Sequence, residues 1–171
     1  MKWGEFRKII VDNLSDDLLT KKYQKLKKSN EVHKTFGHCY VASEAAYYLL
    51  GGKESGWKPC YIKHLSVPHW YLKHESGAIL DLTKEQFQTP VDYEKGRGTG
   101  FLTKEPSKRA RTLLKRIGES KVWQSVRQIY KKEEDAVGDL TAYLEDLCSR
   151  SYGPKHQNKA AELGERTDET E

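Results

Sequence analysis

The stretch "TFGHCYVASEAAYYLLGG", residues 35–52, decides how the first half of this chain folds. Its alanines and leucines recur three and four positions apart, which is the spacing of one face of an α-helix. The pair Gly51-Gly52 predicts the end of this helix, because glycine readily takes the left-handed conformation of a helix C-cap. Cys39 therefore falls in the first turn of the helix, just after a small glycine turn.

The position of Cys39 favours a reactive thiol. Unpaired backbone amides give the N-terminal end of a helix a partial positive charge, which stabilises a thiolate over a thiol. The amide of Cys39 is also placed to donate a hydrogen bond to the oxyanion formed on an attacked carbonyl. A cysteine between apolar neighbours in a helix is, however, often a small buried hydrophobic residue. Both roles remain open at this point.

Three strand-like runs follow the helix and predict a small antiparallel sheet. The runs are residues 58–67, 69–75 and 78–83, separated at Pro68 and by a turn at residues 75–78. In a hairpin with this second turn, His69 and Asp81 are about equally far from the turn on opposite strands. Their side chains can therefore lie side by side on one face of the sheet.

The order Cys39, His69, Asp81 permits a catalytic triad. A nucleophilic thiol needs a general base within hydrogen-bond reach and a third group that orients the base. In that arrangement Cys39 attacks a carbonyl, His69 moves the proton, and Asp81 holds the imidazole tautomer. The structural alternatives are a histidine at the edge of the core and an aspartate that caps residues 84–87.

The segments "GHCYVASEAAYYLLGG" and "HWYLKHESGAILDLTKEQF" resemble the YunG-like proteins of bacteria and phages, over residues 35–87. More distantly, the order of cysteine, histidine and acid resembles the papain-like superfamily, which includes NlpC-type peptidases and transglutaminases. The resemblance implies an α+β fold: a papain-like core, made of a nucleophile helix and a small antiparallel sheet, with a helical C-terminal extension. It also implies a cofactor-free hydrolase or acyl transferase that acts on an amide, isopeptide or ester bond through Cys39, His69 and Asp81.

Further residues are expected to contact the substrate. They are His38, Trp70, Arg97 and Lys104. Trp70 follows the base and would shield it from water. Arg97 and Lys104 belong to a glycine-rich segment, residues 91–106, which would form a flexible flap and hold an anionic group of the substrate. The alternative role of this segment is a surface loop that only joins the sheet to the C-terminal helices.

Charge is distributed unevenly along the chain, whose net charge is +5. Residues 95–132 contain twelve Lys and Arg but only two Glu, whereas acidic residues dominate from position 133 onward. The candidate contacts to nucleic acid in the basic block are Lys108, Arg109, Arg111, Lys115 and Arg116. Nucleic-acid binding is therefore one alternative to catalysis, and an inactive papain-fold protein that binds a partner is another. A solvated helix face, or pairing with the acidic block, also explains the charge.

A zinc site is one alternative, because cysteine and histidine residues gather in one region of the sequence. The region contains His38, Cys39, Cys60, His64 and His69. Its spacing matches no zinc finger, and Pro68 separates His64 from His69, so we expect no metal.

The 171 residues, 36% of them hydrophobic, suffice for one core with an extension. We divide the chain into N-terminal helices (1–34), a papain-like catalytic core (35–90), a glycine-rich loop (91–106), C-terminal helices (107–152) and a disordered tail (153–171). No run of about 18 apolar residues and no signal-peptide pattern is present, so we expect a cytoplasmic protein without membrane contact. Three cysteines without framework spacing favour reduced thiols.

Overall fold

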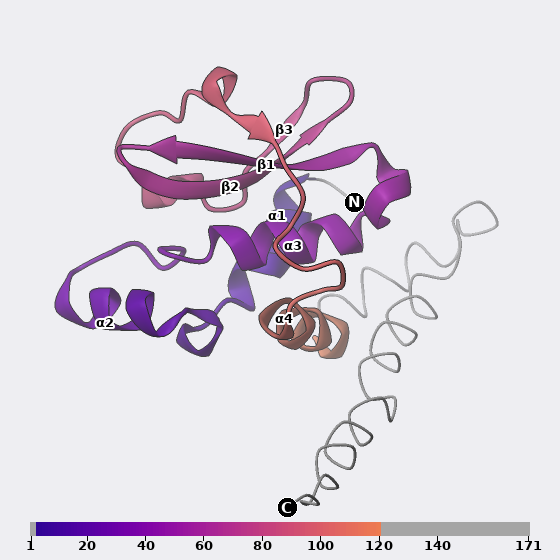
Figure 1. Cartoon of the computed structure of the whole chain (residues 1–171). Coiled ribbons are helices and arrows are strands. Elements are labelled where there is room, and N and C mark those ends of the chain that lie inside the picture. Colours follow the sequence, from indigo (N-terminus) through magenta and orange to yellow (C-terminus); the bar gives the residue numbers. More distant parts are fainter. Residues whose placement is uncertain (1–2, 121–171) are drawn as a thin grey trace, which may run out of the picture. The chain divides into compact units, whose positions relative to one another are not determined.

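A computed structural model describes residues 3–120 of the chain (Figure 1). The helices in this range are α1 (Trp3–Asp12), α2 (Lys21–Ser29), α3 (Cys39–Leu49) and α4 (Lys108–Glu119). The strands are β1 (Trp57–His64), β2 (Val67–His74), β3 (Ile79–Leu80) and β4 (Arg97–Gly98), in the order β3-β2-β1-β4 with antiparallel neighbours. The described residues thus form an α+β fold with a small antiparallel sheet, as the sequence predicts.

Helix α3 is the centre of the fold and lies between the sheet and α4 (Figure 1). Its residues Val41, Ala42, Ala45 and Ala46 have no exposed surface, and their small side chains let neighbouring elements approach closely. The helix begins at Cys39, and Gly51, at φ 98°, follows its end in the left-handed conformation. Both ends agree with the prediction.

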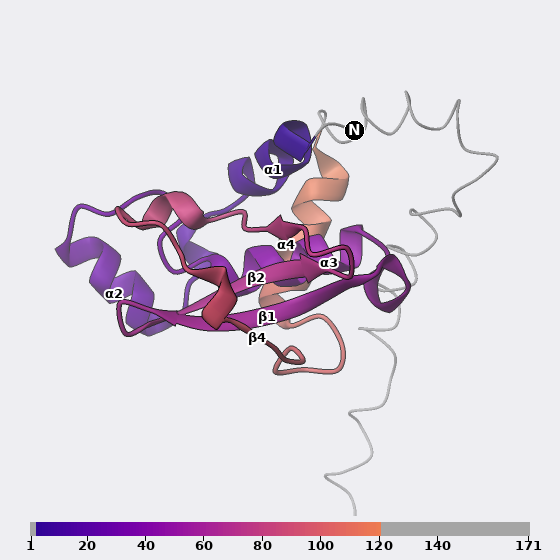
Figure 2. The same ribbon diagram turned by 90° about the horizontal axis from the view of Figure 1, so that it is seen from above.

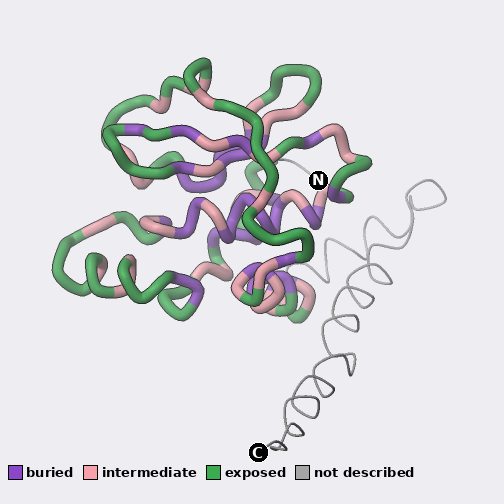
Figure 3. Tube along the Cα trace, in the orientation of Figure 1, coloured by how far each residue is buried: buried purple, intermediate pink, exposed green. Residues whose placement is uncertain are grey.

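Helices α1 and α4 each bury one apolar face in the same core. The buried residues are Phe6, Ile9, Ile10 and Val11 in α1, and Ala110, Leu113, Leu114 and Ile117 in α4. They recur at helical spacing, so the opposite faces are left to solvent (Figure 3). Burying each large aliphatic side chain of this kind contributes about 1.5–3 kcal/mol relative to an exposed one.

The β1–β2 hairpin turns at a place that the sequence does not predict. Leu65 and Ser66 form its two-residue turn, with φ 49° and 64°. Two consecutive positive φ values match the twist of the flanking strands, but glycine or asparagine normally supplies them. The predicted break at Pro68 is wrong, since Pro68 lies within β2, opposite Lys63.

A small second core covers one face of this hairpin. It consists of Cys60, Ile62 and Tyr71, with Ile79, Val91 and Tyr93 packed against them. Part of the predicted flap is therefore anchored to the sheet. Gly96 fits only because it lacks a side chain: a Cβ there would lie 1.8 Å from the Tyr71 hydroxyl oxygen.

The segment after β4 runs across α3 toward α4 (Figures 1 and 2). Phe101 anchors this segment through ring contacts with Tyr40, Tyr47 and Trp70. The predicted helical region beyond residue 120 and the predicted tail at 153–171 lie outside the described residues. Within residues 3–120, no helix has the length and apolar character needed to cross a membrane.

Candidate active site

His69 and Asp81 are brought together by the β2–β3 hairpin. Leu72 pairs with Leu80, so Asp81, the first residue after β3, lies opposite Tyr71. His69 is two positions before Tyr71 on β2 and therefore shares a face of the sheet with Asp81. The His69 Nε2 and Asp81 Oδ2 atoms are 2.5 Å apart, and the two side chains are 0% and 1% exposed. A carboxylate only accepts hydrogen bonds, so Nε2 carries the proton. The predicted juxtaposition of these residues is confirmed.

The Asp81 carboxylate receives several further hydrogen bonds. The Thr83 amide donates to Oδ1 at 2.9 Å, and the Thr83 hydroxyl lies 3.5 Å from the same oxygen. The Tyr93 hydroxyl donates to Oδ2 at 2.9 Å. A buried carboxylate needs donors of this kind to offset its desolvation, and the set leaves Asp81 little rotational freedom.

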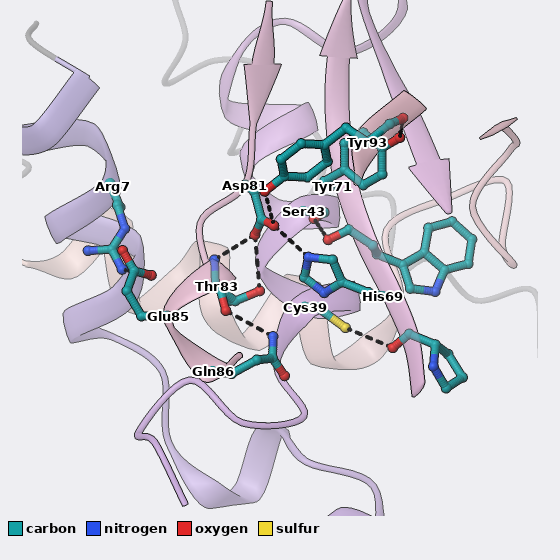
Figure 4. A network of polar contacts seen from close by, with 12 residues as sticks. Arg7, Cys39, Ser43, His69, Tyr71, Asp81, Thr83, Glu85, Gln86 and Tyr93 are labelled. Atoms are coloured by element: carbon teal, nitrogen blue, oxygen red, sulfur yellow. Dashed lines mark hydrogen bonds and ion pairs between the residues drawn. The ribbon is translucent and has the colours of Figure 1, made fainter. Parts of the chain in front are cut away.

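Cys39 lies on the other side of the imidazole (Figure 4). Its sulfur is 3.9 Å from the carbonyl oxygen of Pro68, the residue before His69. The second ring nitrogen of His69, Nδ1, is buried and makes no hydrogen bond to any described residue. The ring therefore has one nitrogen engaged by a carboxylate and one left on the side of the thiol.

The surroundings of His69 favour its protonated form. Burial alone would lower the pKa of His69. The hydrogen bond and the charge of Asp81, and the nearby Cys39, outweigh burial and raise this pKa to about 9. An imidazolium beside a thiol favours the thiolate, as the helix start does.

Aromatic rings hold the imidazole from two directions. Tyr71 lies nearly parallel to it, with ring centroids 6.5 Å apart at 22°, and Phe87 meets it edge-on at 4.8 Å and 89°. These contacts limit rotation of the ring and keep the His69–Asp81 pair away from bulk water.

Gln86 joins the two halves of the site. Its Oε1 accepts a hydrogen bond from the Gly37 amide at 3.4 Å, and its Nε2 donates to the Thr83 carbonyl at 3.0 Å. Gly37 precedes Cys39 by two residues, and Thr83 follows Asp81 by two. The Gln86 amide thus connects the loop that leads to the thiol with the turn that holds the carboxylate.

Two of the four predicted substrate contacts are corrected by the structure. His38 is fully buried, with Nε2 3.1 Å from the Ser15 carbonyl oxygen, and burial lowers its pKa. It stabilises the fold and has no surface for a substrate. Trp70 alternates to the face of β2 opposite His69, where its ring contacts Tyr40 and Phe101, so it does not shield the base.

The other two predicted contacts, Arg97 and Lys104, are exposed, and no described contact joins their side chains to Cys39, His69 or Asp81. Their role toward an anionic substrate stays a prediction.

The basic residues of α4 are largely engaged within the protein. Arg109 donates to the Leu18 carbonyl at 3.1 Å and lies over the Tyr40 ring, and Arg111 donates to the Pro106 carbonyl. Arg116 pairs with Asp17.

The two lysines of the set differ from these arginines. Lys115 is 3.9 Å from Glu119, and Lys108 is exposed, with no ion pair to a described residue. Of the five predicted contacts to nucleic acid, mainly the two lysines thus keep side chains that are accessible to a partner.

The zinc alternative gains no support from the described part of the chain. His64 and His69 direct their Nε2 atoms to Thr89 and Asp81. Within residues 3–120, no group of three or more His, Cys, Asp or Glu side chains has the arrangement of a metal site.

Comparisons of the chain with protein-family models, with curated proteins and with solved structures find no match.

Proposed function

We propose that this protein is a cysteine-dependent hydrolase or acyl transferase that acts on an amide, isopeptide or ester bond. The observation that supports it best is the buried imidazole of His69, which has Asp81 at Nε2 and Cys39 on the side of its unoccupied Nδ1. A nucleophile, a base and an orienting carboxylate in this order form the arrangement of cysteine-dependent acyl transfer.

The chemistry follows from these positions. The Cys39 thiolate attacks the carbonyl carbon, and a tetrahedral oxyanion forms. His69, as imidazolium, gives its proton to the leaving amine or alcohol, and the bond to the leaving group breaks. A thioester on Cys39 remains. Water or another nucleophile attacks its carbonyl carbon while His69 takes a proton from that nucleophile, and the carbon–sulfur bond breaks to return the Cys39 thiolate. Asp81 keeps the imidazole oriented throughout.

The start of α3 supplies donors for the oxyanion. His38, which precedes the helix, makes no capping hydrogen bond with its side chain. Backbone amides of the first turn, that of Cys39 included, are therefore not taken up by this side chain. Together with the antiparallel hairpin that carries His69, this helix start resembles the papain-like core, which we include in the proposal.

Two cysteines of similar burial allow a direct test of the proposed nucleophile. Cys39 and Cys60 are 7% and 4% exposed, and burial raises the pKa of the Cys60 thiol. At pH 6.5, iodoacetamide should therefore modify Cys39 at least about tenfold faster than Cys60, as followed by mass spectrometry of the peptides. His69→Ala and Asp81→Asn should slow Cys39 and leave Cys60 unchanged.

A panel of amide, isopeptide and ester substrates then tests catalysis, with Cys39→Ala as the inactive control. Equal modification rates for the two cysteines in the folded protein would overturn the proposed nucleophile. A reactive Cys39 with turnover that survives Cys39→Ala would place the activity elsewhere.

A further inference from the structure

We propose that Tyr93 is a positioning residue of this site: its hydroxyl fixes the Asp81 carboxylate and moderates how strongly that carboxylate binds the protonated ring of His69. The assignment rests on the proposed function for its catalytic meaning. Its physical content, a hydroxyl that controls an aspartate–histidine pair, can be measured separately.

Tyr93 donates to the same oxygen that His69 uses. Its hydroxyl lies 2.9 Å from Asp81 Oδ2, and His69 Nε2 lies 2.5 Å from that atom. Two donors on one carboxylate oxygen share its negative charge, so each weakens the attraction of the oxygen for the other. The hydroxyl remains a donor at all ordinary pH values, because burial and the charge of Asp81 raise the pKa of Tyr93 far above its usual value.

The hydroxyl is held in place by the packing of the rest of the residue. The Tyr93 ring packs on the small core of the sheet, with its centroid 4.9 Å from that of Tyr71. The Tyr93 carbonyl accepts hydrogen bonds from the Tyr71 hydroxyl at 3.2 Å and from the Gly96 amide at 3.1 Å. These contacts fix the direction of the side chain before any substrate binds, as a positioning role requires.

The titratable groups around the pair come from several elements. Cys39 faces His69 from α3, and Tyr71 faces it on β2 itself. Glu85 and Glu94 act through their charges on Tyr93 and Tyr71, respectively, and His64 shares the Phe87 contact with His69. Tyr93 is distinguished from all of them by its direct bond to Asp81 Oδ2.

The test compares Tyr93→Phe with Tyr48→Phe in the full-length protein. Each variant removes a tyrosine hydroxyl that donates a hydrogen bond, but Tyr48 donates to the Lys104 carbonyl, at 3.3 Å, whereas Tyr93 donates to Asp81. Imidazole ¹⁵N resonances followed against pH, with His69 assigned from His69→Gln, report the midpoint of its titration. Tyr93→Phe should raise this midpoint by about half to one pH unit, whereas Tyr48→Phe should leave it near that of the wild type.

Coincident titrations of wild type and folded Tyr93→Phe would overturn the proposal. If Tyr93→Phe does not fold, the test uses the wild-type protein. The ¹³Cζ resonance of Tyr93 should then shift over the pH range in which His69 titrates. A resonance that stays constant over this range overturns the proposal. Failure of the proposed function gives another result. Cys39 would then react with iodoacetamide no faster than Cys60, but the titration of His69 could still be measured.

Discussion

Cys39 and Ser43, one turn apart on α3, both contact the backbone of β2: the thiol lies 3.9 Å from the Pro68 carbonyl oxygen and the Ser43 hydroxyl 3.1 Å from that of Trp70. Four residues of helix and two residues of strand cover similar lengths, about 6.0 and 6.6 Å. The spacing of the two contacts along α3 therefore matches their spacing along β2. This match sets the position of the Cys39 thiol relative to the His69 imidazole.

Ser43→Ala should loosen this register. The change leaves the Trp70 carbonyl without its donor, at a cost of about 1 kcal/mol in the free energy of unfolding. Because Ser43 lies one turn from Cys39, alkylation of Cys39 should also slow several-fold. Ser29→Ala is a matched control, since the Ser29 hydroxyl bonds only to the exposed end of α2. Equal alkylation rates in the two variants would contradict the role of this contact.

His69 makes the stability of the fold depend on pH. Its pKa is raised from 6.5 to about 9, so its contribution is fully present below about pH 6.5 and is lost as the pH rises through about 9. Urea unfolding from pH 6 to 10 should show the decline, and His69→Gln should flatten it. Burial raises the pKa of Cys60 in the folded protein, so this thiol ionises more readily in the unfolded chain and adds to the decline at high pH. Cys60→Ala is therefore needed as a second variant. A wild-type curve that is level across this range would contradict the assignment.

Glu44 should contribute strongly to stability at a place remote from His69 and Asp81. It is fully buried, its Oε1 accepts the Ser107 amide at 2.9 Å, and its Oε2 accepts the Ser107 hydroxyl at 2.6 Å. Ser107 is the N-cap of α4, so the carboxylate also lies at the positive end of that helix. Burial nevertheless raises the pKa of Glu44.

Glu44→Ala removes both acceptors and should lower the free energy of unfolding by about 2–4 kcal/mol, measured by urea denaturation at pH 7. Glu54→Ala, at an exposed position, should change it by less than about 0.5 kcal/mol. A small loss in Glu44→Ala would show that other contacts hold α4 on α3.

Gly96→Ala should disturb the packing around His69 through Tyr71. The added methyl group would lie 1.8 Å from the Tyr71 hydroxyl oxygen, so the ring or the backbone has to move. Overpacking of this kind costs about 1–3 kcal/mol, and the melting temperature should fall accordingly. Gly100→Ala adds the same group where no atom lies within 4 Å and should melt close to the wild type.

The central helix and the His69–Asp81 contact could be predicted because their signals are local. Alanine and leucine spacing predicts α3, a glycine predicts its end, and the short turn after β2 brings Asp81 to the face of the sheet that carries His69. The Leu65–Ser66 turn could not be predicted, since neither residue is one that favours positive φ. The predicted shielding of His69 by Trp70 is wrong, because adjacent residues of a strand point to opposite faces of the sheet.

The supporting groups were missed for a different reason. Tyr93 follows Asp81 by twelve positions in a segment without periodicity, and only the packed core directs its hydroxyl to the carboxylate. Gln86 reaches Gly37 across 49 positions, which no spacing rule encodes. Glu44 lies in a helix whose alanines predict burial, but its partner Ser107 comes 63 positions later.

Cys39 is only 7% exposed, so the surrounding residues restrict access to it. A slender reagent such as iodoacetamide should therefore modify Cys39 more readily than a bulky aromatic disulfide reagent, which should react far more slowly there than at an exposed thiol. For the proposed function, the same restriction would favour a carbonyl at a chain end or on a flexible side chain over one in the middle of a folded polypeptide.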